Sequence, residues 1–147
     1  YATPALHNMF NGGNAEKYGV ITQVECGRLH SCVVNAEGVG WLFGYNGYGQ
    51  IGNGHVCEWN HGVKQPHCFQ ATHDNYRNLK IKQVSLGSDH TVIATVNNNR
   101  IITFGGNEHN QCSPNNPNQK VLFPHFLHYD EIGLTMAQTY ERVLACT

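Results

Sequence analysis

The chain has 147 residues and a formal net charge of -1, which is the length of one ordinary domain with almost balanced charge. Its Lys and Arg residues are scattered, so we expect no nucleic-acid partner, because nucleic-acid surfaces cluster basic residues. No apolar run approaches the roughly 20 residues of a membrane-spanning helix, and no signal peptide opens the sequence. These features predict an intracellular protein, in the cytoplasm or nucleus, without a membrane partner.

The first half of the chain predicts three short strands. Residues 1–18 hold a short apolar stretch that begins at Pro4, followed by a connector rich in Gly and Asn. Runs of β-branched and aromatic residues bounded by turn residues then predict strands at residues 21–26, 31–35 and 40–43. We expect Gly27 to open a tight turn with a positive φ angle. The glycine-rich run 45–54 predicts a structured loop, and residues 55–66 predict a polar surface insertion.

The same plan returns in the second half. Strands are predicted at residues 79–86, 91–96 and 101–104, with Gly87 at the first turn and a loop at 105–112. A further strand is expected to begin at Pro66 in the first unit and at Pro124 in the second, since Pro suits the first residue of an edge strand. Another copy of the pattern begins at Thr135.

Equivalent residues of the two units lie roughly 60 residues apart, as Gly27 and Gly87 do. A long period made of short strands and glycine turns is typical of β-propeller blades, which are four-stranded antiparallel sheets. The predicted fold class is all-β, with about two complete four-stranded blades and partial flanking blades. We divide the chain into the tail of a preceding blade with its connector (1–18), two repeats (19–78 and 79–130) and the start of a further repeat (131–147).

These units resemble the RCC1 repeat, the blade of the regulator-of-chromosome-condensation family of β-propellers. The first unit matches the pattern of that family at Val24, Gly27, His30, Ser31, Phe43, Gly44, Asn46, Gly49, Gln50, Ile51, Gly52 and Pro66. The second unit matches it at Val84, Gly87, His90, Thr91, Phe104, Gly105, Asn107, Gln111 and Pro124. It departs from the pattern at Asn110, Cys112 and Ser113, so we expect its loop to differ.

The resemblance implies a non-catalytic protein-interaction or scaffold propeller without a cofactor, present here as a fragment of a larger protein or assembly. Its partner would be a protein, either a small GTPase or a large assembly. The alternative function is guanine-nucleotide exchange on a small GTPase, and a third is a structural subunit of a large assembly. Contacts are expected from the loops at residues 53–64 and 108–119.

The repeated histidines are expected to be structural. His30 and His90 occupy equal places in the two units, which favours hydrogen bonding between blades over catalysis. No catalytic triad stands out, and the glycines between Gly44 and Gly49 lack the Lys of a phosphate-binding loop. The structural repeat positions that we predict are Gly27, His30, Gly44, Asn46, Gly49, Gln50, Gly52, Gly87, His90, Gly105, Asn107 and Gln111.

One group of residues has the chemistry of a zinc site. His55, Cys57 and His61 carry imidazole and thiol groups, and His67, Cys68 and His73 follow. Their spacing fits no standard Cys-x2-Cys knuckle, so we favour a surface insertion in a His-rich chain and predict no metal. All six cysteines are expected to be reduced, with Cys26, Cys32 and Cys146 buried in apolar strands. Trp41 is expected to pack in the third strand, and Trp59 to lie in a binding loop.

Overall fold

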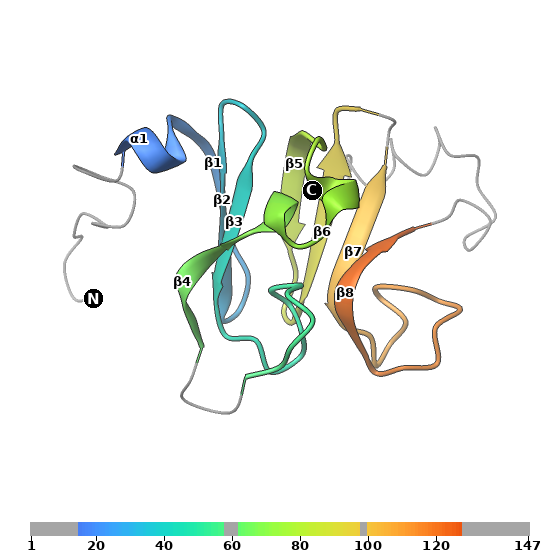
Figure 1. Cartoon of the computed structure of the whole chain (residues 1–147). Coiled ribbons are helices and arrows are strands. Elements are labelled where there is room, and N and C mark those ends of the chain that lie inside the picture. The colour runs from blue at the N-terminus through green and yellow to red at the C-terminus, as the bar shows by residue number, and fades with distance from the viewer. Residues whose placement is uncertain (1–14, 58–61, 98–99, 128–147) are drawn as a thin grey trace.

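A computed structural model describes residues 15–57, 62–97 and 100–127. It contains two four-stranded antiparallel sheets, and in each sheet the strands pair in chain order. The first sheet consists of β1 (Ile21–Cys26), β2 (His30–Asn35), β3 (Gly40–Gly44) and β4 (Val63–Cys68). The second consists of β5 (Ile81–Leu86), β6 (His90–Thr95), β7 (Ile101–Gly106) and β8 (Lys120–Phe126). The sheets stand side by side (Figure 1), which confirms the predicted all-β fold and its two four-stranded blades.

Short helical turns flank the sheets. The helix α1 (Ala15–Tyr18) lies where the sequence predicted only a connector, and the 3-10 turns η3 (Phe69–Ala71) and η4 (Asp74–Tyr76) join the two sheets. The strand predicted at 79–86 begins later, at Ile81, because Leu79 N–H donates to Tyr76 O in the turn after η4. In the part of the chain that the structure describes, no helix has the length and apolar character needed to cross a bilayer.

The fourth strand of each blade begins earlier than its proline. β4 starts at Val63 and β8 at Lys120, so the prediction of Pro-led strands was wrong, and the expected insertion at 55–66 ends in a strand. Both strands bulge away from their neighbours: β4 between Val63 and His67, and β8 between Val121 and His125. Pro66 and Pro124 lie at the end of this bulge, where the ladder requires no N–H donor.

The glycines at the first corner of each blade make room for a histidine ring. Neither Gly27 nor Gly87 has a positive φ angle, so that expectation was wrong. A Cβ added to Gly27 would lie within 3.0 Å of the His30 ring and of the Gly87 carbonyl oxygen. A Cβ added to Gly87 would overlap the ring of His90. The pattern Gly-x-x-His therefore reflects the packing of the imidazole against its own corner.

Gly87→Ala is expected to lower the free energy of unfolding by about 2 kcal/mol, because the added methyl group overlaps the His90 ring. In a His90→Ala background the ring is gone, and the same substitution should cost less than about 0.5 kcal/mol. Urea unfolding of the wild type, the two single variants and the double variant measures this coupling. An equal cost of Gly87→Ala in both backgrounds would show that the ring does not exclude the side chain.

One apolar core joins the two sheets. Cys32, Leu42 and Phe69 of the first blade pack in the same cluster as Val84, Ile93, Ile102 and Phe104 of the second. The rings of Phe69 and Phe104 stack with centroids 6.5 Å apart. On the other face of the first sheet, Trp41 packs edge-on against Tyr18 of α1 at 5.0 Å, so Trp41 lies in the third strand as predicted.

The face of β1 that carries Val24 is exposed, whereas the equivalent face of β5 is buried against the first sheet. Val84 is fully buried between the sheets, whereas Val24 at the equivalent position is 62% exposed. Cys26 is also exposed, so the prediction that it is buried was wrong, while Cys32 is buried as expected. The physical reason is that side chains alternate along a strand, and Cys26 shares the outward face of β1 with Val24.

Candidate functional site

A hydrogen-bond chain crosses between the blades at the repeated histidine. His30 is buried, and its Nε2 lies 3.0 Å from the hydroxyl of Thr91 in the second blade. That hydroxyl donates its only hydrogen to the Gln50 carbonyl oxygen of the first blade at 2.8 Å. The imidazole must therefore donate through Nε2–H, which fixes its neutral tautomer. Burial lowers the pKa of His30 to about 4, more than the nearby His90 backbone and Asp89 carboxylate raise it.

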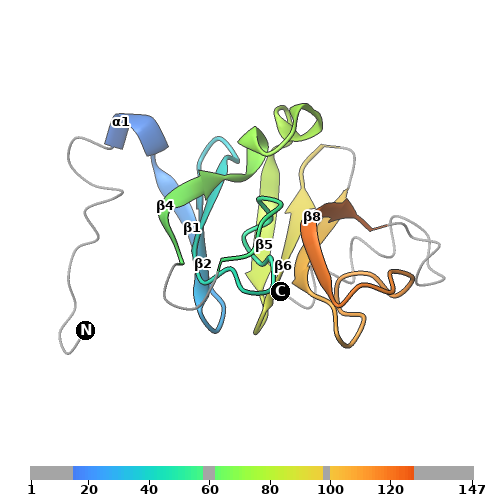
Figure 2. The ribbon, with the colours of Figure 1, turned by 60° about the horizontal axis from the view of Figure 1, so that its bottom comes forward.

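A buried asparagine holds the loop after β3 in shape. Asn46 Oδ1 accepts from Ile51 N–H at 3.0 Å, and its Nδ2 donates to the His55 carbonyl at 2.9 Å and to Asn53 Oδ1 at 3.1 Å. The Gln50 side chain closes the inner turn, because its Oε1 accepts from Tyr48 N–H at 2.9 Å. The loop lies beside the second sheet (Figure 2), where Gly52 packs against the ring of Phe104.

The loop after β7 keeps the same design despite its different sequence. Asn107 Oδ1 accepts from Cys112 N–H and from Ser113 N–H, both at 2.9 Å, and Cys112 is buried where the first loop has Ile51. Asn110 takes the left-handed conformation of Gly49, with φ angles of 61° and 80°. Asn is one of the few residues that adopt this conformation at low cost, so the turn is kept. The expected difference between the loops lies in the amide contacts, because Asn107 Nδ2 faces the carbonyls of Ser113, Asn116 and Asn118, whereas Asn46 Nδ2 donates to Asn53 Oδ1 and the His55 carbonyl.

These frameworks present a cluster at one end of the first blade, which we call the corner surface. It consists of the exposed Arg28 and Leu29 and the half-buried Tyr45 and Tyr48. The β1–β2 corner and the loop after β3, which carry these residues, lie toward the bottom of Figure 1. Leu29 is 50% exposed, and the two tyrosine rings meet edge-on at 6.3 Å. Arg28 Nη2 forms an ion pair with Asp89 Oδ1 at 2.7 Å, which ties the corner surface to the second blade.

The second blade builds the same corners from other residues, namely Ser88, Asp89, Gly106 and His109. The fold therefore does not require apolar or aromatic groups at these places. Arg and Tyr are enriched among the residues that dominate binding energy in protein interfaces. The corner surface is for this reason the candidate functional site, and no covalent chemistry is needed to explain it.

Comparisons with known proteins bear on this arrangement. Two models of the regulator of chromosome condensation (RCC1) repeat match the sequence, one over residues 37–94 and the other over residues 81–111. The chain belongs to the RCC1 repeat family. This RCC1-repeat chain is 32% identical over 92 residues to the X-linked retinitis pigmentosa GTPase regulator of Homo sapiens, which covers 63% of the chain and 8% of that protein. It is 28% identical over 102 residues to the homolog from Caenorhabditis elegans, covering 69% of the chain and 7% of that protein.

Solved structures show the same fold. The RCC1-repeat chain superposes on human WBSCR16 with a TM-score of 0.62 and 22% identity. It superposes on yeast RCC1 (Prp20) bound to Kap60 with a TM-score of 0.58 and 20% identity. Each match covers 74% of this chain and 25% of the other chain. The chain thus spans about a quarter of these propellers and less than a tenth of the two curated relatives.

The structure places only part of the candidate zinc cluster. His55 and Cys57 lie in the loop after β3, whereas His61 lies outside the described residues. His67 Nε2 is 2.7 Å from the hydroxyl of Thr72, and burial lowers the pKa of this imidazole. Within residues 15–57, 62–97 and 100–127, no three His, Cys, Asp or Glu side chains come close enough to hold a metal ion. Trp59, Cys146, the Pro4 stretch and the repeat starting at Thr135 also lie outside the described residues.

Sequence reasoning missed several residues that join the blades of this RCC1-repeat chain. The buried Gln70 accepts from Gly40 N–H and donates to the carbonyls of Gly38 and Leu79. Gln23 Oε1 accepts from Val84 N–H at 2.7 Å, beside the bulge in β5. The two glutamines occur in unremarkable contexts, because their partners lie 9 to 61 residues away. Only the recurrence of Gln23 as Gln83 could have indicated its role.

Proposed function

We propose that this chain is a non-catalytic protein-interaction element of an RCC1-type propeller, and that the corner surface is where its partner binds. The observation that carries the proposal is the exposure of Leu29 beside Arg28 and two tyrosines, at a corner where the second blade has glycine and polar residues. Hydrogen bonds hold the backbone that carries Tyr45 and Tyr48, and the ion pair with Asp89 holds Arg28, so binding would cost little conformational entropy.

Variants that give the first blade the residues of the second test this proposal. Leu29→Asp combined with Tyr48→His should abolish binding of partners that the wild-type chain captures, and leave the unfolding midpoint in urea almost unchanged. Val96→Ser is the matched control, because Val96 is 56% exposed and stands at the far end of β6. Quantitative mass spectrometry of captured proteins should show partners that the control retains and the double variant loses. Equal capture by all three proteins would refute the corner surface.

Guanine-nucleotide exchange on a small GTPase is the second candidate. Its support comes from the relatives: two of them are named X-linked retinitis pigmentosa GTPase regulator or its homolog, and a solved relative, Prp20p, is described with its binding properties to Gsp1p and histones. Release of a fluorescent GDP analogue from Gsp1p, measured with and without this chain, separates the two functions. A rate increase of tenfold or more would support exchange, and an unchanged rate would leave the interaction role alone.

A further inference from the structure

The outer strand of the second blade exposes an apolar bulge that the first blade lacks. The bulge of β8 carries Leu122 and Phe123, whereas Lys64 and Gln65 stand at the equivalent places in β4. Phe123 is 61% exposed. Because the first blade forms the same bulge with polar residues, the geometry of the strand does not account for these apolar side chains.

The β8 bulge is held in place by two other parts of the chain. Gly54 N–H, from the loop of the first blade, donates to the Leu122 carbonyl at 3.0 Å. The hydroxyl of Tyr76 donates to the Pro124 carbonyl at 3.0 Å. Phe123 lies between these two anchored carbonyls, and its ring packs so close to Gly54 that an added Cβ there would overlap it. The exposed ring is therefore preorganised.

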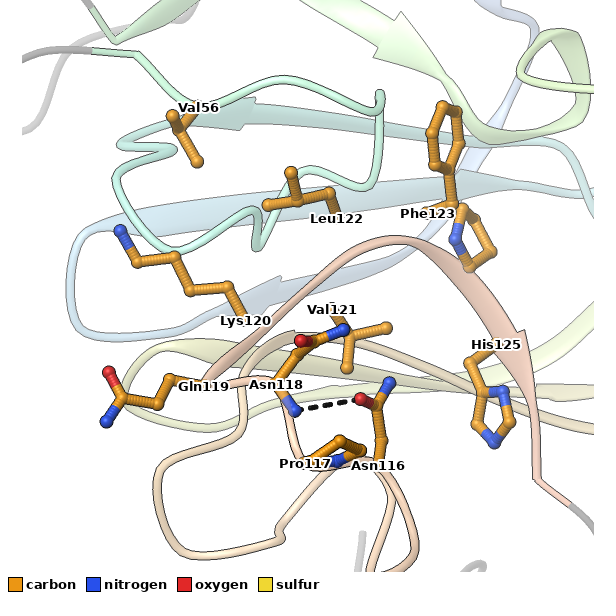
Figure 3. A pocket seen from close by; sticks show the side chains of 11 residues that line it. Val56, Asn116, Pro117, Asn118, Gln119, Lys120, Val121, Leu122, Phe123 and His125 are labelled. Atoms are coloured by element: carbon orange, nitrogen blue, oxygen red, sulfur yellow. Dashed lines mark hydrogen bonds between the residues drawn. The ribbon is translucent and has the colours of Figure 1, made fainter.

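A surface groove of about 980 Å³ follows this strand (Figure 3). Val56, which is 49% exposed, lies with Leu122 and Phe123 along one side, and the amides of Asn116 and Asn118 lie across from them. The ionisable residues among its lining are Lys120 and His125, and none of the eleven lining residues is acidic. The Lys120 ammonium group lies 5.5 Å from the centre of the Tyr48 ring, so the groove adjoins the corner surface.

We propose that this groove binds an extended segment of a partner protein that carries a large apolar residue beside carboxylates. The apolar residue packs against Phe123, Leu122 and Val56, the carboxylates pair with Lys120, and the amides of the opposite side bind the backbone of the segment. The inference rests on the proposed function only in taking the chain as a protein-binding element, because its contacts come from β8, the loop before it and Val56, and not from the residues of the corner surface.

Selection from a random 12-residue peptide library displayed on phage, with the whole chain as bait, tests the proposal. Enriched peptides should combine large apolar residues with Asp or Glu. Their dissociation constants, measured by fluorescence anisotropy of the synthetic peptides, should rise at least about tenfold for Leu122→Lys combined with Phe123→Gln. That variant installs the residues of the first blade. Lys120→Gln should weaken binding about threefold and reduce its dependence on salt.

Two controls separate this inference from the proposed function. Gln65→Ala changes the equivalent bulge of the first blade and should leave peptide binding unchanged, as should Leu29→Asp, which changes the corner surface without touching the Tyr48 ring beside Lys120. Enrichment of basic peptides, equal binding to the Leu122→Lys, Phe123→Gln variant, or no peptide with a dissociation constant below about 1 mM would overturn the proposal. Self-association of the wild type that this variant abolishes would also overturn it, since the occupant would then be a second copy of the chain.

Discussion

Asn107→Ala is expected to lower the free energy of unfolding by about 3 kcal/mol. Asn107 is buried, and its Oδ1 accepts from two backbone N–H groups at 2.9 Å. Its Nδ2 faces the carbonyls of Ser113, Asn116 and Asn118 at 3.0 to 3.2 Å. Alanine would leave the buried N–H groups of Cys112 and Ser113 without an acceptor, and such orphaned donors cost more than the bond itself contributes. Urea unfolding followed by tryptophan fluorescence measures the loss.

The neighbouring Asn118 supplies the control for this experiment. Its side chain is exposed, and its backbone carbonyl, which Asn107 contacts, survives replacement by alanine. Asn118→Ala should therefore change stability by less than about 0.5 kcal/mol. Asn46→Ala should cost about 2 kcal/mol, less than Asn107→Ala. The reason is that Asn46 Oδ1 accepts from one backbone N–H group, whereas Asn107 Oδ1 accepts from two. A reversed order would mean that these amides do not hold the loops.

Stability is expected to fall by up to about 3 kcal/mol as the pH drops from 6.5 to 4, through His30 alone. Burial holds the pKa of this imidazole at about 4 in the folded protein, against an ordinary value of 6.5. Between these two values the unfolded chain binds a proton that the folded chain does not, so acid favours unfolding. Above pH 6.5 both states are neutral and the contribution is fully present. Urea midpoints measured across this range report the slope.

His30→Gln isolates this effect from the other histidines. Burial also lowers the pKa of His67 and of His90, so the wild type combines several contributions of the same sign. Glutamine keeps an amide donor near the Thr91 hydroxyl and does not titrate. The variant should be less stable than the wild type at pH 7 and lose less stability on acidification. Parallel pH profiles for the two proteins would mean that His30 is not kept neutral by the fold.

Much of the fold was predictable from the sequence because its determinants are local. Runs of β-branched and aromatic residues, bounded by turn residues, located six strands. The recurrence of Gly27 as Gly87 gave the length of the repeat. The errors arose at positions where the exposure of a side chain, or the start of a strand, depends on contacts with other strands. Cys26 sits in an apolar run, yet it faces outward on β1. Lys64 and Gln65 are polar, as loop residues are, yet they belong to β4. They lie in its bulge, where side chains need not follow the alternation of a regular strand.

The candidate site was less predictable, for two physical reasons. The bond from His30 to Thr91 spans 61 residues, so sequence alone indicated that the histidine was structural but not which group it meets. The corner surface and the β8 bulge are departures from the repeat rather than parts of it. They emerge only when equivalent residues, such as Leu29 and Asp89, are compared in a known register with their exposure.

The contact between His30 and Thr91 also bears on how such a chain could have grown. Each unit carries an imidazole at one position and a hydroxyl at the next: His30 with Ser31, and His90 with Thr91. One unit's donor meets the following unit's acceptor, so a tandem duplication of the gene segment would supply both halves of every new junction at once. Lengthening the array would then require no compensating mutation at this contact.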